Sequence, residues 1–121
     1  MINMKNTLEK LIAKEYLTAS EAEKCLIEIT EGKHHDILVS SFLTIFMTRT
    51  VSIEELNGFR NALLNLCIKV DLSDYDTIDL CGTGGDEKNT FNISTLSSFI
   101  SAGAGINVAK HGNYGISSNC G

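Results

Sequence analysis

The chain has 121 residues, a formal net charge of −5 and 43% hydrophobic residues. This length fits one compact unit, or a small domain with part of another, and the hydrophobic content is sufficient for a core. The acidic balance argues against a nucleic-acid-binding protein, which would carry a basic patch. It does not argue against a small phosphorylated ligand held by backbone amides, Mg²⁺ and a few local lysines.

The sequence also bears on the cellular compartment. It has no long uncharged apolar run and no basic segment followed by an apolar one near its start, so we expect neither a membrane span nor a signal peptide. The spacing of its four cysteines includes no C-x-x-C pair, which indicates reduced thiols in the cytoplasm. A zinc site that adds His34, His35 or His111 to these thiols is the alternative, and the spacing gives it no support. The cysteines are Cys25, Cys67, Cys81 and Cys120.

Helical periodicity dominates the first seventy residues. Thr18 with Glu21, and Ser52 with Glu55, have the spacing of capping boxes and predict two helix starts. Gly32 predicts a C-terminal cap for the helix that Thr18 opens. The apolar positions at helical spacing are Met4, Leu8, Leu11 and Ile12, then Ala22, Cys25, Leu26 and Ile29, and later Ile53, Leu56, Phe59, Leu63, Cys67 and Ile68.

A further helix is expected from about Asp36 to Arg49. It is too apolar for a helix with one exposed face, so we expect it to form the centre of a bundle or part of an interface. The same reasoning, applied to this helix and to the next one from Ser52 to Lys69, predicts self-association of the helical part. The apolar residues of the expected helix are Ile37, Leu38, Phe42, Leu43, Ile45, Phe46 and Met47.

The periodicity changes near Tyr75. The acidic stretch from Asp71 to Asp76 could suggest a metal site, but its spacing is not that of an EF-hand, and a solvated turn is the favoured interpretation. Beyond it we expect a strand at Ile78–Cys81, a helix at about Asn92–Ala104 and a strand at Ile106–Ala109. Strand, helix and strand of these lengths form a right-handed βαβ unit.

A glycine-rich loop follows the first expected strand. Gly82, Gly84 and Gly85 can turn the chain sharply and direct backbone N–H groups at an anion. An ordinary turn rarely needs three glycines in four positions, so the pattern favours a phosphate site. The loop is not a P-loop, because Glu87 stands before Lys88, and it also lacks the third glycine of the dinucleotide fingerprint.

The expected helix then begins with an excess of polar side chains. Thr90, Asn92, Ser94 and Thr95 all suit an N-cap, but one cap needs only one of them. The others suggest a bound diphosphate, because a helix N-terminus attracts anions.

The second expected strand leads into a Lys-His-Gly-Asn segment. Lys110 would lie beside the glycine loop, where its charge suits a phosphate. His111 could act as a general base or, as a neutral ring, donate to a backbone carbonyl, and the sequence leaves both open. Asn113 offers a donor and an acceptor.

Taken together and in this order, these segments resemble the anthranilate phosphoribosyltransferase family. The matching residues are Gly82–Asp86, Asn92–Thr95 and Lys110–Asn113, followed by Ser117 and Ser118. The resemblance covers the whole chain but only the N-terminal part of the family. It implies an α/β fold: an all-α helical domain at 1–74, then at 75–121 the first βαβ unit of a truncated α/β domain of the nucleoside phosphorylase/phosphoribosyltransferase type.

The resemblance also implies a reaction. The family transfers the phosphoribosyl group from phosphoribosyl pyrophosphate to anthranilate in tryptophan biosynthesis, with Mg²⁺, as a cytoplasmic homodimer joined through the helical domain. It implies that Ser94 ligates Mg²⁺ and that Gly82 and Asn113 contact anthranilate. The residues matching the family's phosphoribosyl pyrophosphate site are Gly82, Gly85, Asp86, Thr90, Asn92, Ile93, Ser94, Thr95, Lys110, His111, Gly112, Asn113, Ser117 and Ser118.

The chain departs from the family pattern at its C-terminal end. Tyr114 stands where Arg is commonest, and a phenol replaces neither the charge nor the fork of a guanidinium. Cys120 stands where Ser is usual, and the family's Asp-Glu metal pair and anthranilate-binding Arg lie beyond Gly121. We therefore expect the 121-residue chain alone to be inactive. Two alternatives remain: a related phosphoribosyl or pentosyl transferase with another acceptor, and a non-catalytic helical dimerisation module.

Overall fold

The computed structural model describes residues 1–82 and 91–112. It divides the chain into two compact units, Met1–Ile68 and Lys69–Gly121, each treated separately below. The first unit is helical, and the second begins with a strand–helix–strand segment, as the sequence predicts. The boundary predicted at residues 74–75 falls between the last helix of the first unit and the first strand of the second. The elements are α1 (Met4–Ile12), α2 (Ala19–Thr30), α3 (Asp36–Thr48), α4 (Ile53–Leu66), β1 (Thr77–Ile78), α5 (Ile93–Gly103) and β2 (Asn107–Val108).

The helix boundaries follow from local signals. Both predicted capping boxes are confirmed: the Thr18 and Ser52 hydroxyls accept from the backbone N–H groups of Glu21 and Glu55, whose carboxylates bind back to the cap N–H groups. Gly32 follows α2 with φ +70°, a left-handed conformation that glycine adopts without a steric penalty. Its predicted role as a C-terminal cap is confirmed by its N–H, which donates to the carbonyl of Ile29 at 3.0 Å.

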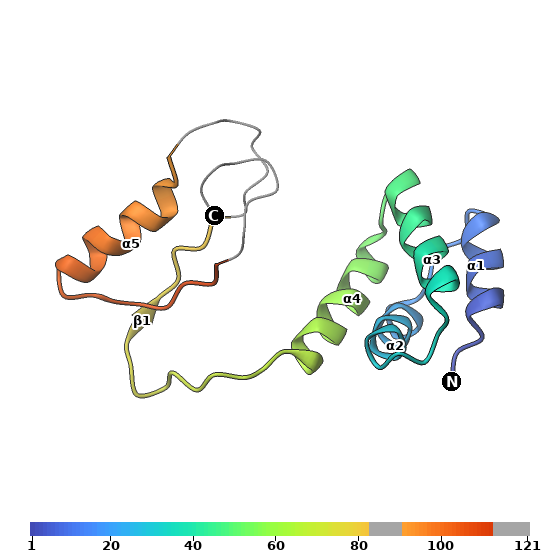
Figure 1. Cartoon of the computed structure of the whole chain (residues 1–121), viewed down its shortest axis with the longest axis horizontal. Helices are drawn as coiled ribbons and strands as arrows, with labels where there is room; N and C mark the ends of the chain where they lie inside the picture. Colours follow the sequence, from blue (N-terminus) through green and yellow to red (C-terminus); the bar gives the residue numbers. More distant parts are fainter. Residues whose placement is uncertain (83–90, 113–121) are drawn as a thin grey trace. The chain divides into compact units, whose positions relative to one another are not determined.

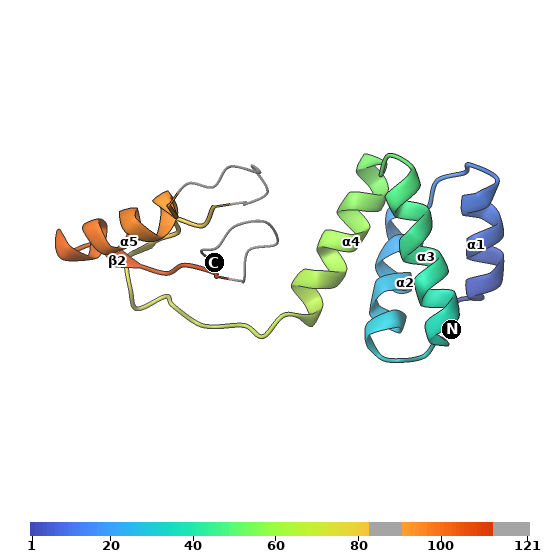
Figure 2. The same cartoon turned by 45° about the horizontal axis from the view of Figure 1, so that its top comes forward.

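The core of the helical unit lies where α2 meets α4 and α1 meets α3 (Figure 2). Phe42 on α3 is buried, and its ring contacts those of Phe46 and Phe59 edge to face, with centroids 4.9 and 6.2 Å away. Gly58 on α4 brings the backbones of α2 and α4 close together, because a Cβ there would lie 2.3 Å from the carbonyl oxygen of Ala19. The buried hydrophobic cluster consists of Met4, Leu8, Leu11, Leu17, Ala22, Cys25 and Phe42.

The third helix is only partly internal. Phe42 lies in the core, but Ile37 and Met47 remain 69% and 85% exposed within the described chain. The sequence predicts that this helix forms either core or interface. One side of it forms core. The other side presents an apolar surface.

A buried ion pair links three segments of the helical unit. Glu55 is fully buried and accepts hydrogen bonds from the guanidinium of Arg49, from the N–H of Ser52 at 2.9 Å and from the N–H of Leu17 at 3.0 Å. The Arg49 guanidinium also lies over the rings of Tyr16 and Phe46, 5.0 and 4.5 Å from their centroids. Burial raises the pKa of Glu55, but these hydrogen bonds lower it by more, so the pKa lies below its ordinary value.

In the second unit β1 and β2 are parallel and paired directly, with α5 between them in sequence and packed on β2. The strands are shorter than predicted, because only Thr77 with Asn107 and Ile78 with Val108 are paired. The carboxylate of Asp79 accepts a hydrogen bond from the N–H of Cys81 at 2.8 Å, and this Asx-type contact turns the backbone out of strand geometry.

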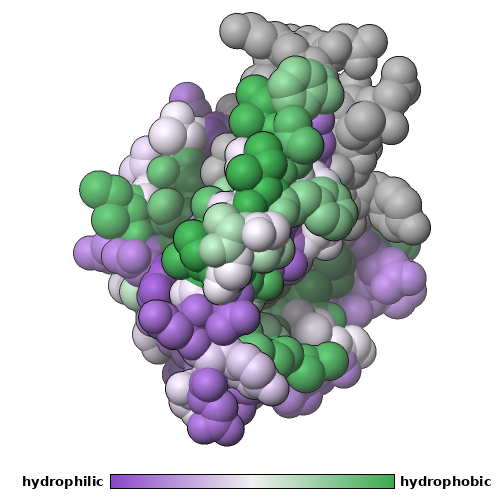
Figure 3. Space-filling model, turned by 90° about the vertical axis from the view of Figure 1, so that its left-hand side faces the viewer, coloured by the Kyte–Doolittle hydropathy of each residue, from purple (hydrophilic) through white to green (hydrophobic). Residues whose placement is uncertain are grey.

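Helix α5 is amphipathic but has no fully buried residue. Figure 3, in which the left-hand side of Figure 1 faces the viewer, shows hydrophobic side chains gathered on that face. Within the described residues, no helix has the length and hydropathy needed to cross a membrane. The exposed large apolar residues of α5 are Ile93, Leu96, Phe99 and Ile100.

Candidate functional site

The predicted site residues that the structure describes gather at one edge of the second unit. This edge contains the carboxyl ends of β1 and β2 and the N-terminus of α5, where open α/β sheets bind ligands. The described members are Gly82, Asn92, Ile93, Ser94, Thr95, Lys110, His111 and Gly112, whereas Gly84, Gly85, Asp86, Thr90, Asn113, Tyr114, Ser117 and Ser118 lie outside the described residues.

The start of α5 is capped by a single residue. The Asn92 side chain accepts a hydrogen bond from the N–H of Thr95 at 2.9 Å, so Asn92 is the N-cap. The hydroxyls of Ser94 and Thr95 are therefore not needed for that cap, and both residues are half-buried at the helix start. Ile93 is exposed, and its side chain is apolar, so any phosphate contact there would use its backbone N–H.

Gly82 and Ser94 are in close contact. A Cβ built on Gly82 would lie 2.6 Å from Ser94 Oγ and 3.5 Å from Ser94 Cβ. A larger residue would force the Ser94 hydroxyl to move, because the segment after β1 runs directly against the first turn of α5. The absence of a side chain at Gly82 thus lets the backbone after β1 approach the N-terminus of α5 closely.

The Lys-His-Gly segment continues from β2 beside the end of β1. The N–H of Ala109 donates to the carbonyl of Ile78 at 3.0 Å, and the thiol of Cys81 lies 3.4 Å from the carbonyl oxygen of His111. Lys110 is half-buried, and His111 is exposed. This arrangement places a lysine in the segment that the Cys81 thiol contacts, next in sequence to His111.

Two residues of this edge were not identified as site residues from sequence. Asp79 was placed inside the expected strand Ile78–Cys81, and Cys81 was treated only as a reduced thiol. An Asp side chain can accept a hydrogen bond from the N–H two residues later, and this pattern could have indicated the turn that Asp79 makes with Cys81. The contact of Cys81 with His111 spans 30 residues and has no local signal.

The described residues do not by themselves form a metal centre. In residues 1–82 and 91–112, no three His, Cys, Asp or Glu side chains lie close enough together to hold an ion. Ser94 contributes a hydroxyl, which is a weak ligand for a hard cation such as Mg²⁺. A magnesium site here would need carboxylates from outside the described residues.

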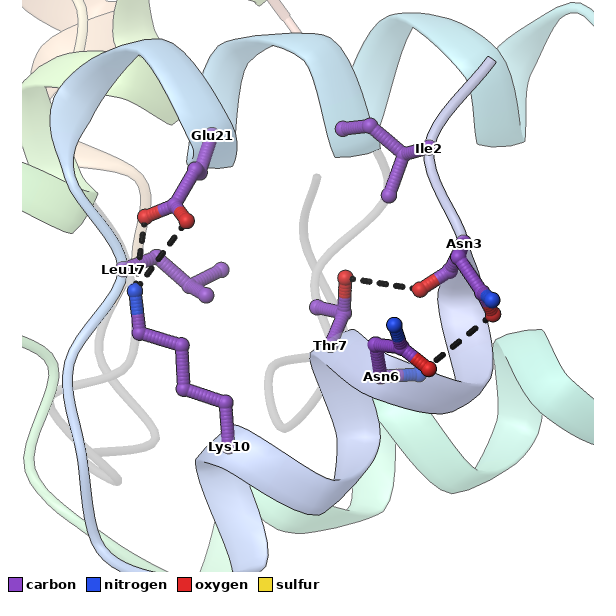
Figure 4. Close-up of a pocket in the computed structure, with 7 residues that line it drawn as sticks. All are labelled: Ile2, Asn3, Asn6, Thr7, Lys10, Leu17 and Glu21. Atoms are coloured by element: carbon purple, nitrogen blue, oxygen red, sulfur yellow. Dashed lines mark hydrogen bonds and ion pairs between the residues drawn. The ribbon is translucent and has the colours of Figure 1, made fainter.

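A pocket of about 260 Å³ lies in the helical unit, between α1, the segment before α2 and α2 itself (Figure 4). Its polar groups are paired with one another: Lys10 Nζ lies 2.9 Å from Glu21 Oε2, and the Thr7 hydroxyl donates to the carbonyl of Asn3. The pocket therefore does not present a set of converging polar groups to a ligand.

Comparison with known proteins identifies both parts of the chain. Residues 5–67 match the helical bundle domain of a glycosyl transferase family, and residues 74–121 match the a/b domain of the same family. The helical bundle match alone covers more than half of the chain.

Several curated relatives carry the name anthranilate phosphoribosyltransferase. The one from Flavobacterium johnsoniae is 63% identical over 115 residues, that from Christiangramia forsetii 59%, and that from Bacteroides thetaiotaomicron 54%. Each alignment covers 95% of this chain but 35% of the relative, so the chain spans about a third of the length of these proteins, in their N-terminal region.

These matches confirm the resemblance seen in the sequence motifs. They also confirm the order of a helical domain followed by the start of an α/β domain. The chain belongs to the glycosyl transferase family in which a helical bundle domain precedes an a/b domain.

Proposed function

We propose that this chain forms the N-terminal part of an anthranilate phosphoribosyltransferase. The observation that carries the proposal is the contact of Gly82 with Ser94 at the N-terminus of α5, with the Lys110–Gly112 segment alongside. A close backbone approach, a helix N-terminus and a lysine together suit a diphosphate. The names of the relatives favour anthranilate over another acceptor.

In this proposal the residues of the edge bind and orient phosphoribosyl pyrophosphate. The bond between ribose C1 and the pyrophosphate oxygen breaks, a bond from the anthranilate nitrogen to C1 forms, and the amine loses a proton. The chain stabilises the leaving polyanion by position and charge, without a covalent intermediate. Anthranilate would lie near Gly82 and Asn113, as the family resemblance implies.

The proposal includes Mg²⁺, which would neutralise charge on the departing pyrophosphate when bound. Ser94 would be one ligand, and the carboxylates would come from the Asp-Glu pair that the family carries further along its sequence. We also assign the protein to tryptophan biosynthesis in the cytoplasm, in keeping with the proposed substrates.

Replacing Ser94 by alanine in the complete enzyme should raise the KM for phosphoribosyl pyrophosphate about tenfold or more and leave that for anthranilate within about twofold. Asn113→Ala should raise the KM for anthranilate and leave that for phosphoribosyl pyrophosphate nearly unchanged, because Asn113 matches a residue on the acceptor side of the family's site. Steady-state kinetics at saturating Mg²⁺ provides both values. If Ser94 only supported the helix start, Ser94→Ala would lower thermal stability and leave both KM values unchanged.

A double-mutant cycle separates steric from ligand effects at the same site. Gly82→Ala introduces a Cβ 2.6 Å from Ser94 Oγ, and adding Ser94→Ala removes that oxygen, leaving a Cβ–Cβ distance of 3.5 Å. The double variant should therefore regain the stability that Gly82→Ala loses. It should not regain the affinity for phosphoribosyl pyrophosphate, because the Ser94 hydroxyl is missing. Equal recovery of both would mean that Ser94 has no role in binding.

We further propose that the helical unit forms the homodimer interface. Met47 and Ile37 on α3 provide exposed apolar surface, and surfaces of this kind mark interfaces. Phe46, which the sequence left open as an interface or core residue, packs in the aromatic cluster with Phe42 and Phe59. Met47 is therefore the better residue with which to probe association.

Sedimentation of the 121-residue chain at high micromolar concentration should show a dimer. Met47→Glu should convert it to a monomer with an unchanged circular dichroism spectrum, because the charge would be buried without a partner. Ile68→Glu, at a residue that is 93% exposed at the end of the unit, serves as the control and should leave the dimer intact. A monomeric unmodified chain would refute the interface.

A further inference from the structure

The two chain segments at the candidate site stay in contact beyond the paired strands themselves. In the β1–β2 pair, Thr77 is opposite Asn107 and Ile78 is opposite Val108, an offset of 30 residues. Cys81 and His111 are also 30 residues apart, and Cys81 Sγ lies 3.4 Å from the carbonyl oxygen of His111. The thiol thus makes a contact between the two segments beyond the last strand pair.

The backbone of Cys81 does not make this connection. Its N–H is held by the Asp79 carboxylate at 2.8 Å, so this donor is directed into the local turn. The contact with the His111 segment is instead made by the thiol. The thiol also lies 3.5 Å from the carbonyl oxygen of Gly82, so two carbonyls are within reach of its one proton.

This contact joins the three elements of the site. On one side, Gly82 lies against Ser94 at the start of α5. On the other, the thiol reaches the segment that contains Lys110 and Gly112. Cys81 is therefore linked to the helix N-terminus through Gly82, and to the segment with the lysine that we assign to the donor phosphates through His111.

We infer that Cys81 is a positioning residue of the candidate site, whose thiol holds the Lys110–Gly112 segment beside Gly82. The part of the inference that concerns donor binding rests on the proposed function. Cys81 touches no reacting atom and acts through the backbone of His111. A valine has a similar volume but no donor, whereas a serine keeps a donor on a shorter side chain.

The contact itself can be tested without any substrate. Nuclear magnetic resonance of the 121-residue chain reports the carbonyl ¹³C shift of His111, which moves upfield when that oxygen loses a hydrogen bond. Cys81→Val should move it upfield and Cys81→Ser should restore most of the difference. An unchanged His111 carbonyl shift in Cys81→Val would overturn the inference.

Its consequence is tested in the complete enzyme with phosphoribosyl pyrophosphate. Cys81→Val should raise the KM for this donor about threefold to tenfold, with kcat and the KM for anthranilate within about twofold, and Cys81→Ser should stay near the unmodified enzyme. A purely structural role would lower the melting temperature of Cys81→Val and leave the donor KM unchanged. If the unmodified enzyme used no phosphoribosyl pyrophosphate, the proposed function would fail, and the His111 carbonyl shift would still decide the contact.

Discussion

Replacing Gly58 by alanine should lower the free energy of unfolding of the helical unit by about 3 kcal/mol. Inside a helix this change normally stabilises a protein by up to about 1 kcal/mol, because glycine loses more backbone freedom on folding. Here the new Cβ would lie 2.3 Å from the carbonyl oxygen of Ala19 and 2.8 Å from the Cβ of Ala22. A backbone oxygen cannot rotate away, so α2 and α4 would have to separate.

Chemical denaturation of the 121-residue chain, followed by circular dichroism, measures this loss. Two other glycines provide matched controls. Gly103→Ala meets no atom within 4 Å in α5 and should be neutral or slightly stabilising. Gly32→Ala also has free space, but its φ of +70° should cost about 1 kcal/mol. A Gly58→Ala chain as stable as the original would show that the α2–α4 contact is looser than described.

Glu55→Gln should destabilise the helical unit by about 3 kcal/mol at neutral pH, through loss of the buried charge opposite Arg49. Glutamine has nearly the same shape, so packing is preserved while Arg49 loses its counterion. Glu21 offers a matched control, because it also occupies the third helical position in a capping box. Unlike Glu55, it is 45% exposed and paired with Lys10 at the surface. Glu21→Gln should cost less than about 1 kcal/mol.

The same pair predicts a pH dependence of stability. The pKa of Glu55 is lower in the folded chain than its ordinary value of 4.5. The stabilisation is therefore fully present above about pH 4.5 and is lost as the pH falls through the lower folded pKa. Below that pH the carboxyl is protonated and resembles glutamine, so the original chain and Glu55→Gln should approach equal stability. A difference that stayed constant down to pH 2 would contradict the ion-pair account.

Local features of this fold could be predicted because their signals lie within a few residues. The capping boxes at Thr18 and Ser52 depend on a residue three positions later, and the Gly32 cap depends on its own backbone freedom. The second role of Glu55, accepting from Leu17 across 38 residues, has no such signal. The first strand was predicted to end at Cys81 but ends at Ile78, because a hydrophobic pattern does not show that Asp79 captures the N–H of Cys81.

The candidate site likewise has features that could be predicted from local sequence and others that could not. The glycines and hydroxyls of the loop and helix start indicate an anion site because their residue types are unusual at that spacing. The close approach of Gly82 to Ser94 and the contact of Cys81 with His111 follow only from the tertiary structure. Part of the predicted site, including Gly85, Asp86, Asn113 and Ser117, lies outside the described residues and stays a prediction.

In the function that we propose, the edge formed by β1, α5 and β2 binds phosphoribosyl pyrophosphate for transfer to anthranilate. The most direct measurement incubates the complete enzyme, which carries these residues, with both substrates and Mg²⁺, and follows phosphoribosyl anthranilate and pyrophosphate. We predict one pyrophosphate for each anthranilate consumed, a rate at least about tenfold lower in Gly82→Ala, and no product from the 121-residue chain alone. Transfer to a different acceptor, or a Gly82→Ala enzyme with undiminished activity, would contradict the account.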